Sequence, residues 1–126
     1  PRTLFPYTTL FRSSPLSVPL PMSVAENIDP EEALVAATSS CHMLFFLSLA
    51  AQRGYVIDDY RDDAVGELGK NAAGRLAMTR IVLRPRISFA GTSPTPEALA
   101  SLHHDAHERC YIANSLTADV VVEGVA

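Results

Sequence analysis

The spacing of apolar positions changes along the chain, and each spacing predicts an element. The clearest one starts at the run D-P-E-E, residues Asp29–Glu32, where an acid precedes proline at the first helical position and a glutamate follows the acid by three residues. These are helix-start signals, and Gly54 is the matching stop. We predict a helix from Asp29 to about Arg53. Its body, Ala33–Ala51, contains no Asp, Glu, Lys or Arg.

Downstream of this helix the apolar period becomes two. Residues 75–89 carry apolar side chains at odd positions and arginines at several even ones, which predicts one long strand with an apolar face and a basic-polar face. Pro85 favours an edge strand or a bulge within it. We expect residues 55–66 and 67–73 to be extended and to lead into a turn at residues 70–74.

A second helix is predicted from Thr95-Pro96, which repeats the capping logic, to about Asn114. Its apolar stripe, at steps of three and four residues, consists of Leu99, Leu102, Ala106 and Cys110. This stripe should face the core. Residues 116–125 alternate again and predict a last strand. The order helix, strands, helix, strand indicates a single α+β domain in which an antiparallel sheet packs on the helices.

The first helix is apolar nearly all round, and it has two possible settings. Its uncharged body is long enough to span a bilayer. Hydroxyl and imidazole groups are spread through it, however, and it lacks the Lys/Arg flanks of a membrane span. We therefore predict a helix that is buried in protein and no association with a membrane. A domain this small can hardly bury it within one subunit, so we expect a homodimer with a subunit interface along this helix.

The first 28 residues follow none of these patterns. From about Thr3 to Ser13 they resemble the translation of a sequencing-adapter oligonucleotide, so we exclude Pro1–Ser13 from the fold. Ser14–Ile28 is proline-rich and reads as an irregular remnant of the N-terminal region, which leaves Asp29–Ala126 as the folded domain. The natural N-terminus is then expected to be missing. Prolines also interrupt the apolar core that a secretory leader would need.

Composition adds information on charge and compartment. Excluding Arg2 and Arg12 leaves 8 of the 10 basic residues against 14 acidic ones, a formal charge of −6. Such a chain does not have the concentrated basic surface of a nucleic-acid-binding protein. Without a leader we expect the reducing cytoplasm, where Cys41 and Cys110 would not form a stable structural disulfide.

A few side chains could carry chemistry. Taken alone, Cys41 and Cys110 are typical of inert packing residues. His103 and His107 lie four residues apart, a spacing used for metal ligands, but no third ligand stands at a fixed spacing. We therefore predict that they lie on a solvated polar face of the helix, opposite the apolar stripe. Glu31 is a first-turn acid that suits the helix dipole. It lies about 15 Å along the helix from Cys41, so it could orient a group that contacts this thiol but cannot touch the thiol itself.

At these residues the chain resembles a known family. The stretch N-I-D-P-E-E-A-L-V-A-A-T-S-S-C-H-M is similar to the signature helix of the OsmC/Ohr family, the osmotically inducible and organic hydroperoxide resistance proteins. In that helix an acidic residue precedes the peroxidatic cysteine by ten positions, here Glu31 and Cys41. The stretch H-E-R-C-Y-I-A-N-S resembles the segment with the resolving cysteine, here Cys110, and departs from the most familiar pattern just after it. The resemblance covers about Asp29–Val125.

The resemblance implies a thiol peroxidase that reduces organic hydroperoxides and hydrogen peroxide. Members of the family are homodimers with intertwined sheets, use a dithiol reductant and require no metal or organic cofactor. An arginine on an N-terminal strand, held by the glutamate that matches Glu31, activates their peroxidatic cysteine. Residues 14–28 contain no arginine, so we expect the printed chain to be a weak or inactive peroxidase. The alternatives are a non-catalytic dimeric binding or structural module and a small metal-binding protein that uses His103 and His107.

Overall fold

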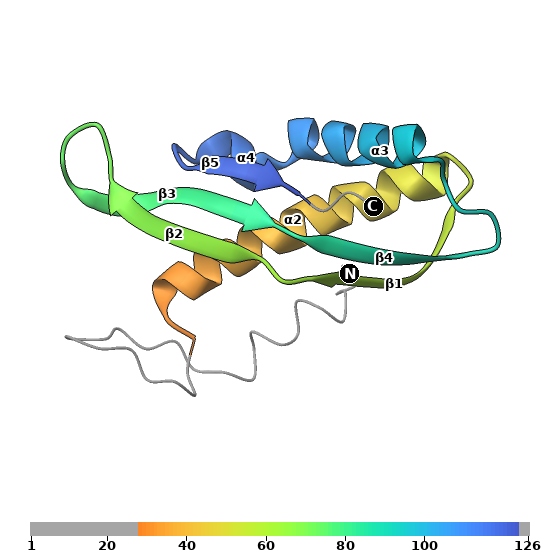
Figure 1. Cartoon of the computed structure of the whole chain (residues 1–126), viewed down its shortest axis with the longest axis horizontal. Helices are drawn as coiled ribbons and strands as arrows, with labels where there is room; N and C mark the ends of the chain where they lie inside the picture. Colours follow the sequence, from red (N-terminus) through yellow and green to blue (C-terminus); the bar gives the residue numbers. More distant parts are fainter. Residues whose placement is uncertain (1–27, 124–126) are drawn as a thin grey trace, which may run out of the picture.

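The computed structural model describes residues 28–123, and within them it has the predicted α+β architecture (Figure 1). The expectations for Pro1–Ser13, for nearly all of Ser14–Ile28 and for the last three residues lie outside the described part. The long helix α2 contacts three of the strands, and α3 packs along it. In chain order the elements are α2 (Pro30–Gln52), β1 (Val56–Asp62), β2 (Val65–Lys70), β3 (Leu76–Leu83), β4 (Pro85–Ala90), α3 (Pro96–Arg109), α4 (Tyr111–Ser115) and β5 (Asp119–Val122).

The ends of α2 fall where the sequence predicts them. The Asp29 carboxylate accepts a hydrogen bond from the Glu32 backbone N–H at 2.8 Å, and the Glu32 carboxylate accepts one from the Asp29 N–H at 3.3 Å. This capping box satisfies amides that have no partner within the helix. Gly54 follows the helix with a φ of +85°, in the left-handed region that favours glycine. The predicted helix is confirmed to within about one residue at each end.

The strands form two small sheets. β1 pairs antiparallel with β4, while β3 lies between β2, its antiparallel partner, and β5, which runs parallel to it. The expectation of an antiparallel sheet is therefore correct for two strand pairs and wrong for the third. The chain reaches β5 from β4 by way of α3 and α4, and a helical crossover of this kind can return a strand in the parallel direction.

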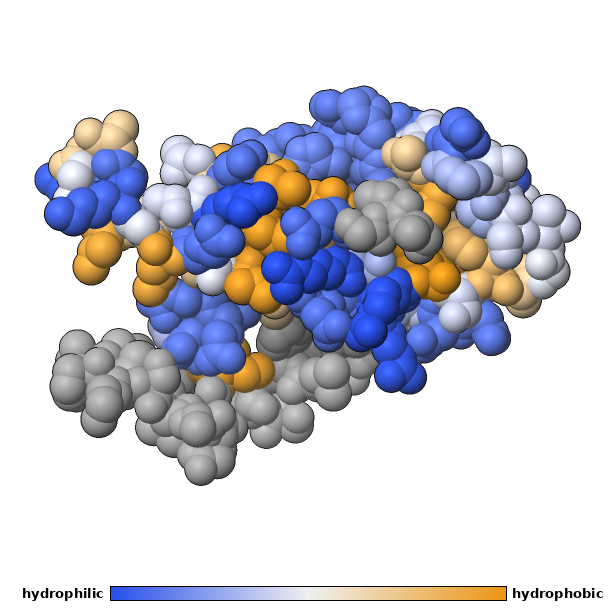
Figure 2. Space-filling model, viewed as in Figure 1, coloured by the Kyte–Doolittle hydropathy of each residue, from blue (hydrophilic) through white to orange (hydrophobic). Residues whose placement is uncertain are grey.

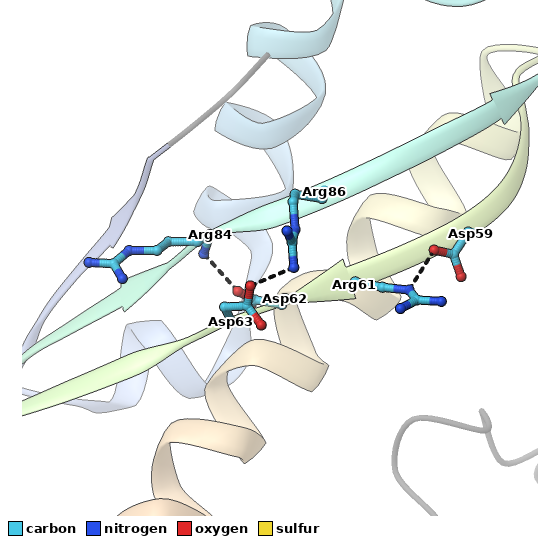
Figure 3. A network of polar contacts seen from close by, with 6 residues as sticks. All are labelled: Asp59, Arg61, Asp62, Asp63, Arg84 and Arg86. Atoms are coloured by element: carbon cyan, nitrogen blue, oxygen red, sulfur yellow. Dashed lines mark hydrogen bonds and ion pairs between the residues drawn. The ribbon is translucent and has the colours of Figure 1, made fainter.

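The long strand predicted around Pro85 is divided into β3 and β4, which belong to different sheets. At the division the Arg84 backbone N–H donates to Asp62 Oδ1 at 2.7 Å, and Pro85 has no N–H to donate. Because neither residue donates a backbone hydrogen bond to a neighbouring strand, the ladder of hydrogen bonds is interrupted here. Figure 3 shows the junction, where Arg86 also pairs with Asp63 at 2.6 Å.

Asp62 fixes this junction to α2. Its Oδ2 accepts a hydrogen bond from the Ser39 hydroxyl of α2 at 2.5 Å. The carboxyl group is partly buried, and burial raises its pKa above the usual value. The ion pair of Arg61 with Asp59, at 2.9 Å, lies farther along β1 and is exposed to solvent (Figure 3). Asp62 is thus the polar contact that joins the long helix to the point where the two sheets meet.

The buried side chains form two clusters, both of which include α2. The first joins the C-terminal half of α2 to α3 and β1 through Met43, Phe46, Leu49, Ala50, Tyr60, Leu99, Leu102 and Ala106. The second joins the N-terminal half of α2 to β3 through Val35, Ile81 and Leu83, with Val120 and Val122 of β5 packed against them. The alternation predicted for the last strand is confirmed by these two valines.

Gly66 allows β2 to approach α2 closely. A Cβ atom built on Gly66 would lie 2.5 Å from Val35 Cγ2 and 2.7 Å from Met78 Sδ. We expect G66A to lower the free energy of unfolding by about 1–3 kcal/mol, because overpacking forces neighbouring side chains to shift. Denaturant unfolding measures this. G69A, on the same strand, is the matched control, since its Cβ would come no closer than 3.0 Å to Thr79 Oγ1. Equal losses in the two variants would contradict the explanation.

By length and composition α2 could cross a membrane, yet it packs into both core clusters of this domain. Figure 2 shows patches of apolar surface between hydrophilic residues on one face of the molecule. The large apolar side chains that remain exposed among the described residues are Val56, Val65, Leu68, Leu76 and Tyr111. The subunit interface predicted along α2 stays a prediction.

Candidate active site

The structure brings Cys41 and Cys110 together within one protomer. Cys41 lies in the middle of α2, and Cys110 lies at the break between α3 and α4. The second helix therefore does not continue to Asn114 as predicted. Cys110 has extended backbone angles and caps α4, its Sγ accepting a hydrogen bond from the Ala113 N–H at 3.4 Å. Cys41 raises the pKa of Cys110, which shows that the two thiols lie close to each other.

The two thiols differ in exposure. Cys110 is 1% exposed, whereas Cys41 is only partly buried. Burial raises the pKa of Cys110 to about 11, and the neighbouring Cys41 raises it as well, against the opposing effect of the α4 amides. A reagent from solvent therefore meets Cys41 first, and Cys110 is held as a neutral thiol behind it.

An aromatic contact links the two elements that carry the cysteines. Phe45 follows Cys41 by one helical turn, and Tyr111 follows Cys110 directly. Their rings meet edge to face with centroids 5.1 Å apart. This contact joins α2 to α4 and holds the elements that carry the two cysteines against each other.

A pair of buried histidines lies in the interface between α2 and α3. His42 Nε2 and His103 Nδ1 are 3.0 Å apart, and the two rings are nearly parallel. Burial, aided by His103 and His107, lowers the pKa of His42 to about 3, and burial lowers that of His103 to about 4. The solvated face predicted for His103 is therefore wrong. Its neighbour Leu102 lies on the core stripe, and the stripe is wide enough to turn His103 toward α2.

His107 lies one turn after His103 on the same side of α3. The residue is partly exposed, but its Nδ1 is buried and has no hydrogen-bond partner among residues 28–123, and the same holds for His42 Nδ1. In that part of the chain no three His, Cys, Asp or Glu side chains are placed to hold a metal ion. The three histidines thus form a cluster between α2 and α3, because both His103 and His107 act on the pKa of His42. Their spacing by four residues in α3 is visible in the sequence, but the part played by His42 is not.

Glu31 lies away from the thiols. It lines a groove of about 840 Å³ together with Ser40 and Arg61, among other residues, and neither cysteine belongs to this lining. Within residues 28–123, the Glu31 side chain forms no hydrogen bond and no ion pair. The structure therefore separates Glu31 from the two cysteines, and its predicted role in orienting an activating group stays a prediction.

Comparison with known proteins places this arrangement in a family. The family model described as OsmC-like protein matches residues 24–124 of the chain. The chain belongs to the OsmC-like family. The match includes both cysteines, the histidine cluster and the whole of α2. The resemblance to the OsmC/Ohr family that the sequence suggested is thereby confirmed.

Solved structures agree with this membership. An OsmC-like protein of unknown function from Vibrio cholerae is 57% identical, with a TM-score of 0.79 over 84% of this OsmC-like chain and 70% of the other. The organic hydroperoxide resistance protein OhrB of Bacillus subtilis is 19% identical, with a TM-score of 0.65 over 79% and 71% of the two chains. An organic hydroperoxide resistance protein OsmC from Legionella pneumophila is 18% identical, with a TM-score of 0.62 over 80% and 69%. The last two show a shared fold. No curated protein matches the chain significantly.

Proposed function

We propose that this OsmC-like protein is a thiol peroxidase that reduces organic hydroperoxides and hydrogen peroxide in the reducing cytoplasm, as a homodimer. The observation that carries the proposal is the pairing of a partly exposed thiol, Cys41, with a buried neighbouring thiol, Cys110. Two thiols with unequal access suit a reaction in which one is oxidised first and the other resolves it. The names of the B. subtilis and L. pneumophila proteins, which refer to organic hydroperoxide resistance, support the same reading.

The first step takes place at Cys41. Its thiolate attacks the distal oxygen of the hydroperoxide, the O–O bond breaks, and the alcohol leaves after taking up a proton. Cys41 becomes a sulfenic acid. The apolar group of the substrate would lie against apolar side chains near the thiol, for which Phe45, one helical turn after Cys41, is a candidate.

The second step uses Cys110. Its sulfur attacks the sulfenic sulfur of Cys41, water is released, and a disulfide forms. The two thiols are neighbours within one protomer, which suits formation of an intramolecular disulfide. A dithiol reductant then reopens the disulfide by thiol–disulfide exchange. None of these steps uses a metal or an organic cofactor.

Activation of Cys41 requires a cation, because a neutral thiol is a poor nucleophile. Arg80, Arg84 and Arg86 are engaged with Glu67, Glu123 and Asp63 in exposed ion pairs. The family resemblance implies that the cation comes from a segment before α2 and is oriented by Glu31. We accordingly propose that the printed chain turns over slowly and that a chain with an arginine-bearing N-terminal strand turns over faster.

The proposal is tested by counting thiols after a single oxidation. One equivalent of cumene hydroperoxide should remove both free thiols of the protein together and lower the intact mass by two hydrogens, with dithiothreitol restoring both. The buried thiol should not be lost alone. If both thiols survive an excess of the hydroperoxide, the peroxidase proposal is wrong, and a non-catalytic dimeric module explains the fold better.

A further inference from the structure

The reaction just described leaves one proton unassigned. Cys110 must lose its proton to attack Cys41, yet the buried sulfur has a pKa near 11. At pH 7 only about one Cys110 in ten thousand would be ionised. The resolving step therefore needs a base close to Cys110, on the interior side of the protein.

His42 and His103 are unsuited to this task. Each ring already uses one nitrogen in the contact with the other. Burial also makes both rings weak bases, with pKa values of about 3 and about 4. Their rings are nearly parallel and pack against Phe46, with centroids 6.5 Å from Phe46 for His42 and 4.4 Å for His103. This pair fills the space between α2 and α3 and excludes water from it.

His107 has the properties that the other two lack. It lies three residues before Cys110, on the same side of α3, and its carbonyl accepts the Cys110 N–H at 3.2 Å. Its Nδ1 is buried without a hydrogen-bond partner among the described residues, while the residue as a whole is partly exposed. The ring thus has one side in solvent and one nitrogen in the interior, on the turn of α3 that leads to Cys110. A buried ring nitrogen without a partner costs stability and calls for an explanation.

We propose that His107 accepts the proton of Cys110 during disulfide formation. The inference rests on the proposed peroxidase function. Nδ1 takes the proton as the Cys110 S–H bond breaks, and the sulfur attacks the sulfenic sulfur of Cys41. The S–S bond forms, the S–O bond breaks, and the departing hydroxide combines with a proton to give water. Cys110 is oxidised while Cys41 is reduced, and His107 returns to its neutral form.

The test compares H107Q with the wild type in a single oxidation by excess cumene hydroperoxide. Glutamine keeps a polar side chain but cannot accept the proton. Oxidation of Cys41 should proceed at the wild-type rate, and disulfide formation should be roughly 100-fold slower, the lower range for a general base. The sulfenic acid should then persist and be trapped by dimedone, which adds to it and is detected by intact mass.

H104Q is the matched control. His104 lies on the exposed side of α3, beside Glu108 at 3.8 Å, and does not face the thiols. This variant should form the disulfide at the wild-type rate. A second variant, H107A, should recover part of the lost rate when imidazole is added to the solution, which a purely structural role of the ring would not produce.

The outcomes separate the two proposals. If H107Q forms the sulfenic acid and closes the disulfide as fast as the wild type, His107 is not the base, although the peroxidase proposal stands. The same conclusion follows if H107A is slow but imidazole has no effect. If the wild-type protein forms no sulfenic acid at Cys41, the peroxidase proposal fails and the role of His107 falls with it.

Discussion

Replacing Cys41 by serine is expected to reduce hydroperoxide consumption to the rate of the uncatalysed reaction. The serine hydroxyl is nearly the same size as the thiol, so the α2 packing should survive, but it cannot become the sulfur nucleophile that the first step needs. The measurement is loss of cumene hydroperoxide in the presence of dithiothreitol. Consumption that continues undiminished in C41S would show that another group carries the chemistry.

C110S is the companion variant because it removes the other sulfur from the same pair. We expect it to reduce one equivalent of hydroperoxide at the rate of the first wild-type turnover and then to stall as the sulfenic acid, which dimedone should trap at Cys41. Thermal unfolding of both variants controls for damage to the core, since Cys110 is buried. Complete inactivity of C110S in the first turnover would assign the nucleophile to Cys110 and reverse the proposed roles.

The second large effect is a loss of stability in acid that arises from His42 and His103. Both rings have a lower pKa in the folded protein, about 3 and about 4, than the value near 6.5 expected in the unfolded chain. Between pH 6.5 and 4 the unfolded chain therefore binds protons that the folded protein excludes. The stabilisation is complete above about pH 7 and is lost as the pH falls toward 4. We expect a loss on the order of 3 kcal/mol between pH 7 and pH 5.

Denaturant unfolding at a series of pH values measures this effect. The double variant H42L/H103L should lose most of the pH dependence, while H104Q should keep it, because His104 is exposed. Asp62 acts in the opposite direction, since burial raises its pKa and favours the folded state as the pH falls. For that reason the informative quantity is the difference between the wild type and the double variant. Equal slopes in the two proteins would show that the histidine pair does not set the acid stability.

The sequence predicted best those elements whose signals are local. The capping box and Gly54 lie within the segment that they delimit, and α2 was placed from them to within about one residue. The division of the strand at Arg84 depends on Asp62, which lies twenty-two residues away in the sequence. The parallel direction of β5 depends on the route through α3 and α4. A local pattern can predict neither the hydrogen bond between Arg84 and Asp62 nor the direction of β5.

The candidate site, too, could be predicted from local sequence patterns only in part. The apolar stripe of the second helix placed Cys110 in the core, and the structure confirms its burial. The stripe could not show that His103 also turns inward, because imidazole is polar. Its burial here depends on the parallel ring of His42, which belongs to α2. The family resemblance implies that the two thiols lie close together. Their spacing in the sequence does not predict this proximity.

The sharing of α2 between the two core clusters has a consequence for how the domain loses its structure. Neither sheet has an apolar layer that is independent of this helix. Detaching one sheet would expose the part of α2 that packs on it, and it would weaken the packing of α2 on the other sheet. We therefore expect the two sheets to unfold as a single cooperative unit. Opening one sheet alone costs free energy because it also disturbs α2, on which the other sheet packs.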